Sequence, residues 1–387
     1  MARMNPTGDP LSAIREGFYV ERPGGSVRST LKPRLEVDPV STHLVLGGIG
    51  SGKTSELLVS ARTLRSSLLP EGDHVDYIDV SKDFDLDRRA SAGVLVALAG
   101  LSLSGAVVTA KENQPPDLKD AIREVRRHAL GYSIDRDLFQ EHFPGVLNAD
   151  YDATEANDAP DLSELVEPLK ILLSHLPGSG KHAIFFFDSL DRLPRPENFV
   201  TLVQHDIAIL KRAGIGAVVV GPVRYVAGND RGLTELFDHT TFQLSIDPCD
   251  EAGLNFLCEI LRRRTGQDDL LPEECLQPLA VASGGVLRDL ITLAKRAVEE
   301  AYIAGRDRVE LSDVAVARDA MGRGLAIGLD DEQLGALRKV HASERFVVRG
   351  ERELSLLETR RVLMYEGSRR VVHPALSPLL GMMPEVT

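Results

Sequence analysis

The sequence contains no tryptophan, and aromatic residues make up only 5% of its 387 positions. Surfaces that stack single-stranded bases need exposed aromatic side chains, so this composition argues against a base-stacking platform. The three cysteines, Cys249, Cys258 and Cys275, are an odd number without metal-ligand spacing. We therefore expect reduced, structural cysteines in a protein of the cytoplasm.

Long apolar runs are also missing. No segment approaches the roughly 18 apolar residues of a membrane span, and residues 1–10 lack the basic-then-apolar layout of a signal peptide. The formal net charge is −13, whereas proteins that wrap nucleic acid are usually basic. The balance argues against a membrane partner and against extensive DNA binding, but it leaves room for a small local basic surface.

Apolar runs suited to buried strands alternate with segments of helical spacing. Strands are expected at 43–46, 74–80, 183–188, 216–221 and 241–246, and helices at 56–69, about 90–103, 162–176 and 199–213. Runs such as Phe185-Phe186-Phe187 suit parallel strands covered on both faces. The alternation predicts a doubly wound α/β domain.

The chain divides into four parts. Residues 1–40 are rich in Gly, Pro and charge and predict an extended lead-in with one short helix. Residues 41–248 form the α/β core, with 104–161 as a partly helical insertion that ends in a flexible acidic loop. Residues 249–325 are wholly helical in pattern, and 326–387 change character again.

One motif carries clear chemistry: a buried strand runs into Gly47-x4-Gly52-Lys53-Thr54, and a helix follows. This is the Walker A pattern in its proper context. Its expected phosphate-binding residues are Gly47, Gly48, Ile49, Gly50, Ser51, Gly52, Lys53, Thr54 and Ser55. Lys53 would reach the β- and γ-phosphates of ATP, and the Thr54 hydroxyl would ligate Mg²⁺. A ligand-free glycine turn would explain the glycines but not the Lys-Thr pair.

A second acidic element follows the apolar strand that ends at Asp188. A carboxylate at this position emerges beside the P-loop, so Asp188 is the second candidate magnesium ligand. Hydrolytic relatives often carry Glu immediately afterwards, but Ser189 stands here and the next carboxylate is Asp191. Asp191 is our candidate for positioning the attacking water. The alternative is that either Asp simply caps a turn.

At these residues the sequence resembles the AAA+ and STAND classes of P-loop ATPases. Asp188-Ser189-Leu190-Asp191-Arg192 is similar to the acidic box of STAND and KAP-type NTPases. The resemblance implies an ASCE-type P-loop NTPase core with a C-terminal helical lid at 249–325 and a winged helix at 326–387. Residues 18–23 resemble the lead-in that packs on adenine, which implicates Tyr19 and Val20.

The same resemblance implies functional roles for three arginines. The strand that ends at Gly221 resembles a sensor-1 strand with Arg224 near its tip, and 283–290 resemble the sensor-2 helix of initiator ATPases, whose arginine is Arg288 here. Arg231 precedes the last core strand, where a trans-acting arginine finger sits. For each of these three arginines the alternative stays open that it is a surface or loop arginine without a catalytic role.

The C-terminal segment interleaves arginines with glutamates, which nearly cancels its positive field. A recognition helix usually presents an uncancelled basic face, so we favour protein docking over DNA binding. The first hypothesis is an ATP-hydrolysing switch that signals to a partner effector protein or a homo-oligomer, plausibly in bacterial anti-phage defence. The alternatives are a DNA-loading or transposition-type ATPase and a nucleotide-dependent scaffold with little hydrolysis.

Overall fold

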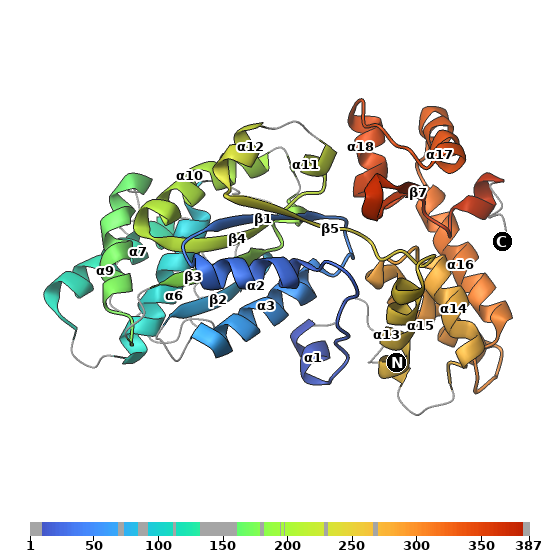
Figure 1. Cartoon of the computed structure of the whole chain (residues 1–387), viewed down its shortest axis with the longest axis horizontal. Coiled ribbons are helices and arrows are strands. Elements are labelled where there is room, and N and C mark those ends of the chain that lie inside the picture. Colours follow the sequence, from blue (N-terminus) through green and yellow to red (C-terminus); the bar gives the residue numbers. More distant parts are fainter. Residues whose placement is uncertain are drawn as a thin grey trace.

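A five-stranded sheet flanked by helices forms one end of the molecule, and C-terminal helices form the other (Figure 1). The computed structural model describes residues 10–68, 73–83, 92–110, 114–131, 161–178, 182–193, 195–196, 198–227, 231–265 and 270–381. The acidic loop expected before residue 161 lies outside the described residues.

All strand pairs of this sheet are parallel, and the strand order is β2-β3-β4-β1-β5. The strands are β1 (Thr42–Gly47), β2 (His74–Asp79), β3 (Ala183–Asp188), β4 (Ile215–Gly221) and β5 (His239–Gln243). The five predicted strands are confirmed, although the last one starts and ends earlier than expected. It ends at Gln243 because the next amides bond elsewhere: Ser245 N donates to Met364 O, and Ile246 N donates to Gly285 O.

Both faces of the sheet are buried, as the apolar runs predicted. Phe186 packs on the face covered by α2 (Val27–Val37) and α3 (Lys53–Leu68). Phe185 and Phe187 point to the other face. That face is covered by α6 (Val94–Ala110), α7 (Pro116–Gly131), α9 (Val166–Ser174) and α10 (Asn198–Ala213). Alternate side chains of one strand thus supply two separate cores.

The lead-in differs from the prediction, because it contains two helices, α1 (Pro10–Arg15) and α2, instead of one. The α2 helix carries buried Val27, Leu31 and Leu35 on one stripe, and the Ser26 side chain caps its first turn. Its charged residues and Pro33 obscured this spacing in the sequence. The lead-in is therefore part of the core.

The first part of the predicted insertion also belongs to the core. The α6 helix extends through Ala110, and its residues from Val94 to Ser104 are all buried. The N-terminus of α6 is buried too, and the Asp206 carboxylate of α10 satisfies it by accepting hydrogen bonds from the amides of Gly93, Leu95 and Val96. Burial raises the pKa of Asp206 to about 7, while these bonds oppose the rise.

The remaining core elements are short connections. They are α4 (Val80–Asp83), η4 (Leu162–Leu165), η5 (Leu190–Arg192), α11 (Arg224–Ala227) and α12 (Arg231–Leu236). No helix among the described residues combines the length and apolar character that membrane crossing requires.

After β5 the chain forms four helices with their own apolar core, which we call the helical unit: α13 (Glu251–Thr265), α14 (Glu273–Ala282), α15 (Leu287–Ile303) and α16 (Leu311–Ala326). The following C-terminal module contains α17 (Asp331–Ser343), α18 (Glu351–Glu358), β6 (Val362–Met364), η6 (Glu366–Ser368), β7 (Arg370–Val372) and η7 (Ser377–Leu380). The predicted hairpin is confirmed, with Val362 opposite Val372 in an antiparallel pair.

Replacing Asp206 with Ala should lower the free energy of unfolding by about 1–3 kcal/mol, because three buried amides lose their acceptor. Asp206→Asn keeps one acceptor oxygen and should lose less. Denaturant unfolding measures both. Asp161→Ala is the matched control, since this exposed cap accepts a bond from Ser163 N at a solvated helix end. Equal losses at the two positions would contradict the role of Asp206.

Candidate nucleotide site

The loop between β1 and α3 forms a backbone cradle. Gly50 and Gly52 have φ of 80° and 93°, a left-handed conformation that glycine adopts without strain. No atom lies within 4 Å of the position that a Cβ on Gly48 would take, so space is open beside the loop. Since α3 begins at Lys53, its unpaired N-terminal amides meet the loop, which favours an anion there.

Lys53 lies at the centre of this cradle. Its Nζ donates to Gly47 O at 2.9 Å and to Gly48 O at 3.0 Å, and it forms an ion pair with Asp191 Oδ2 at 2.9 Å. The side chains of Lys53 and Asp191 are only 5% and 11% exposed. The structure thus brings Asp191 to the phosphate-binding lysine, where sequence reasoning expected a carboxylate.

Asp188 ends β3 next to Asp191, and its side chain is almost fully buried. It accepts hydrogen bonds from the Thr54 hydroxyl, from Tyr77 Oη at 2.7 Å and from Ser189 N at 2.7 Å. Burial raises the pKa of Asp188 and outweighs these stabilising bonds, and the charge of Asp191 adds to the rise. Since burial disfavours the negative charge of Asp188, a cation bound beside this carboxylate would stabilise its charged form.

Ser189 occupies the position where many hydrolytic relatives carry Glu. Its φ is 72°, so it is one of the described non-glycine residues in the left-handed region. The side chain is buried, and its Oγ has no hydrogen-bond partner. A residue in this conformation costs about 1–3 kcal/mol and often marks a functional site. The turn directs the chain so that Asp191, not residue 189, reaches Lys53.

The helical unit contacts the cradle through the first turn of α15. Leu287 N donates to Gly50 O at 3.0 Å, and a Cβ on Gly50 would lie 2.9 Å from Arg288 Cβ and from Val286 Cγ1. Arg288 is half-buried there. Burial lowers the pKa of Arg288, and the neighbouring Arg192 and Arg360 add to this effect. The carboxylates of Asp289 and Asp191 oppose this effect, so the arginines and the carboxylates lie together beside the loop.

The lead-in bridges the core and the helical unit. Tyr19 Oη donates to Glu56 Oε1 at 3.1 Å, and Tyr19 O accepts from Arg263 at 2.6 Å. Val20 packs against the core of the helical unit. Arg22 donates to Ser51 O at 3.2 Å and to Leu244 O at 2.6 Å. Tyr19 and Val20 thus lie between the P-loop helix and the helical unit, and their contact with adenine stays a prediction.

The other two arginines are placed differently. Arg224 donates to both carboxylate oxygens of Glu351 at 2.9 and 2.7 Å and lies 3.7 Å from Glu358, so these partners come from α18 and not from the P-loop. Its sensor role is unsupported by these contacts. Arg231 begins α12, and its side chain lies outside the described part of the chain. The arginine-finger role stays a prediction.

Sequence reasoning missed three site residues. Tyr77 comes from β2 and reaches Asp188 because Asp79 and Asp188 pair in register two residues further on. Arg22 contacts the loop and Arg192 lies near Arg288; both belong to segments that were singled out, 18–23 and 188–192, without being named as site residues. No sequence signal selected Tyr77, because the same strand also carries Asp76 and Asp79.

These residues fit a nucleoside triphosphate with Mg²⁺. The cradle, Lys53 and the arginines supply donors for phosphate oxygens, while Thr54 and Asp188 supply hard oxygen ligands for the metal. The described residues contain no cluster of three His, Cys, Asp or Glu side chains that would hold a metal unaided. Phosphate oxygens and water would therefore complete the coordination.

The fold and site together define the class. One strand, β4, separates the P-loop strand β1 from the acidic strand β3, and all are parallel. With the Walker A loop at the end of β1, this is the α/β fold of ASCE-type P-loop NTPases, and the helical unit follows this core.

Several solved structures are similar to this chain over nearly its whole length. The Aeropyrum pernix ORC2 protein (ADPNP-ADP complexes) has a TM-score of 0.47 at 16% identity and covers 95% of this chain and 96% of its own. Cdc6p from Pyrobaculum aerophilum has a TM-score of 0.41 at 14% identity, covering 98% and 97%. The Thermotoga maritima RuvB Holliday junction branch migration motor has a TM-score of 0.40 at 14% identity, covering 99% of each chain. No family model and no curated protein sequence matches the chain.

Removing the Tyr77 hydroxyl should weaken metal-dependent nucleotide binding, because Tyr77 orients the Asp188 carboxylate. We expect Tyr77→Phe to lower Mg²⁺ affinity by about 10–100-fold, the usual effect of a residue that orients a metal ligand. Titrating Mg²⁺ into the protein with ATP measures this. Tyr225→Phe is the control, because its hydroxyl donates to Pro196 O. An unchanged Mg²⁺ requirement in Tyr77→Phe would contradict the assignment.

Proposed function

We propose that this protein is a Mg²⁺-dependent ATP-binding switch that hydrolyses ATP slowly and passes its nucleotide state to the C-terminal module and through it to a partner protein. The observation that carries the proposal is the position of Lys53, held by two P-loop carbonyls and Asp191 beside the buried Asp188, which accepts a hydrogen bond from Thr54. This arrangement serves phosphate and metal, and a simple strand-to-helix turn has no need of it.

Lys53 changes partner in the proposed cycle. In the structure, the Asp191 carboxylate pairs with the buried Lys53 ammonium at 2.9 Å. When phosphate oxygens take over Lys53, Asp191 loses this partner while staying at the same end of the sheet. Its carboxylate is then free to accept a hydrogen bond from water and orient it, with modest help as a base. Ser189 cannot do this, because its hydroxyl is a far weaker base and is buried.

Slow turnover follows from the same geometry. Asp191 must leave an ion pair before it can orient water, and Ser189 replaces the usual glutamate. A scaffold that binds nucleotide and scarcely hydrolyses it is the extreme case of this proposal. ATP-dependent assembly of homo-oligomers without phosphate release would identify that case. The bacterial anti-phage setting rests on the resemblance of the acidic box alone.

A DNA-loading ATPase of the initiator type is the second candidate function. We propose that the C-terminal module is a winged helix, since α17 and α18 are followed by the β6–β7 hairpin. Exposed Arg345 and Arg349, just before α18, favour a contact with DNA phosphates. Most other arginines of the module already bind groups within the protein. Arg352 pairs with Asp330 and Glu332, and Arg360 pairs with Asp289. Arg361 donates to two backbone carbonyls of 325–327, and Arg369 pairs with Asp247. These pairs favour protein docking.

The Lys53→Ala variant should lose high-affinity ATP binding, because no other described group holds the centre of the cradle. Calorimetric titration with ATP and Mg²⁺ measures this, and a melting curve verifies that the variant is folded. Lys211→Ala is the matched control, since this exposed lysine pairs with Asp238 at 2.7 Å far from the cradle motif. Wild-type affinity in Lys53→Ala would remove the P-loop assignment.

Asp191→Asn should retain ATP binding but lower turnover by about 10²–10⁴-fold, the range of a positioned acid–base group. Asp188→Asn should weaken Mg²⁺-dependent binding as well, because Asp188 contacts Thr54 at the metal position. Phosphate release and calorimetry on both variants separate the two roles. If Asp191→Asn hydrolyses ATP at the wild-type rate and only its melting temperature falls, Asp191 is structural.

Binding of the full chain to random duplex DNA should be weaker than micromolar at physiological salt, because four arginines of the module already bind groups within the protein. Fluorescence anisotropy over a salt series measures it, with the Arg345→Glu/Arg349→Glu double variant as control. Submicromolar binding that weakens steeply with salt and is lost in the double variant would establish the DNA-loading candidate.

A further inference from the structure

Residues 283–289, which we call the α15 entry segment, lie between the P-loop and the C-terminal module. On the P-loop side, Leu287 N donates to Gly50 O at 3.0 Å, and Leu287 Cδ1 lies 3.0 Å from the position of a Cβ on Gly52. Backbone and side chain of one residue therefore contact two glycines of the cradle. Any shift of the entry segment changes the surroundings of the loop.

The C-terminal module contacts the same segment on the side opposite to the P-loop. Tyr365 Oη donates to Gly284 O at 2.8 Å, and a Cβ on Gly284 would lie 2.3 Å from Leu363 Cδ1. Val286, Leu363 and Tyr365 form a small buried apolar cluster. Gly284 has φ of 58° and no room for a side chain, so the hairpin packs directly on the backbone of the entry segment.

Charged groups add to the contact between the C-terminal module and the entry segment at Asp289, which is buried. Arg360 Nη1 donates to Asp289 Oδ1 at 2.7 Å, and His373 Nε2 lies 3.3 Å from Asp289 Oδ2. His373 is fully buried, and its Nδ1 accepts a hydrogen bond from Ala375 N at 3.2 Å. The His373 Nε2 and Asp289 Oδ2 atoms face each other without forming a hydrogen bond. Both partners of Asp289 belong to the C-terminal module.

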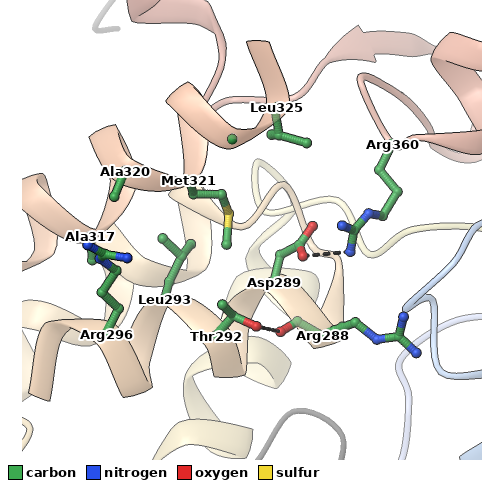
Figure 2. A pocket seen from close by; sticks show the side chains of 11 residues that line it. Arg288, Asp289, Thr292, Leu293, Arg296, Ala317, Ala320, Met321, Leu325 and Arg360 are labelled. Carbon is green, nitrogen blue, oxygen red and sulfur yellow. Dashed lines mark hydrogen bonds and ion pairs between the residues drawn. The ribbon is translucent and has the colours of Figure 1, made fainter. Parts of the chain in front are cut away.

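Asp289 and Arg288 are consecutive residues on α15, so their side chains diverge by about 100°. Figure 2 shows the result: Asp289 points toward Arg360, while the Arg288 guanidinium points away from both, toward the blue ribbon of the N-terminal part. The two residues line one end of a cavity of about 340 Å³ whose wall includes Leu293 and Met321. In this one helical turn, Asp289 thus faces the C-terminal module and Arg288 faces the cradle.

We propose that Asp289 is a positioning residue for Arg288, through which the C-terminal module sets the response of the site to the terminal phosphate of ATP. The proposal rests on the proposed ATP-binding function. Arg360 holds Asp289 beside the buried His373, Asp289 fixes the first turn of α15, and that turn carries Arg288 against Gly50. Because coupling between two sites is reciprocal, a partner that moves the module alters ATP affinity, and ATP alters the hold on the module.

The test compares ATP and ADP affinities by calorimetry with Mg²⁺, because the resemblance of 283–290 to a sensor-2 helix implies that Arg288 acts on the terminal phosphate. Arg360→Ala should lower the preference for ATP over ADP by at least about fivefold, the lower end of typical couplings. Asp289→Asn keeps the shape of the side chain but loses its charge, and it should lower the preference similarly. Arg360→Lys keeps the charge and should recover most of it.

The decisive measurement repeats Arg360→Ala in an Arg288→Ala background, where it should leave the ATP/ADP ratio unchanged. Arg352→Ala is the matched control: it removes another arginine of the C-terminal module, whose partners Asp330 and Glu332 lie outside the entry segment. The wild-type ratio should persist in this control. A ratio unchanged in both Arg360→Ala and Asp289→Asn, or equal shifts with and without Arg288, would overturn the proposal.

The positioning role and the proposed function fail in different ways. If the wild-type chain shows no ATP binding that depends on Lys53, the proposed function fails and the positioning role of Asp289 falls with it. If Lys53-dependent binding is intact and the ATP/ADP ratio does not respond to Arg360 and Asp289, the positioning role alone is wrong. Melting curves verify that each variant is folded.

Discussion

The P-loop and the helical unit meet at one backbone hydrogen bond, from Leu287 N to Gly50 O. It can form only because Gly50 has no Cβ, which would otherwise lie 2.9 Å from Arg288 Cβ and Val286 Cγ1. Phosphate binding needs the glycine for the shape of the loop, and the helical unit needs the same glycine for close approach. The position of Arg288 relative to the cradle, and that of the C-terminal module behind it, both depend on this contact.

Local patterns predicted most of the fold. The parallel strands are continuous apolar runs, such as Phe185–Phe187, because both faces of the sheet are covered, and that signal is readable in one sequence. Asp188 ends β3, and Lys53 begins the helix that follows β1 and the glycine loop, so the strand ends indicated where both lie. The hairpin of the C-terminal module was also predicted from its turn and its apolar flanks.

Contacts between distant segments could not be predicted. Tyr77 reaches Asp188 only through the register of β2 on β3, and Arg224 pairs with Glu351 only because α18 packs against α11. No local pattern indicates either pairing, since both depend on tertiary packing. The α2 helix was missed for another reason: its apolar stripe is diluted by charge, and burial against the sheet decides its state.

The strand order has a consequence for how the chain is made. The P-loop strand β1 lies between β4 and β5, which both come far later in the sequence. As the chain emerges from the ribosome, the apolar residues of β1 and α6 are exposed until residue 243 has been synthesised. The helical unit, by contrast, forms its core from neighbouring helices. Sheets closed by late strands fold slowly and expose apolar surface on the way. The α/β core therefore exposes apolar surface for longer during synthesis than the helical unit does.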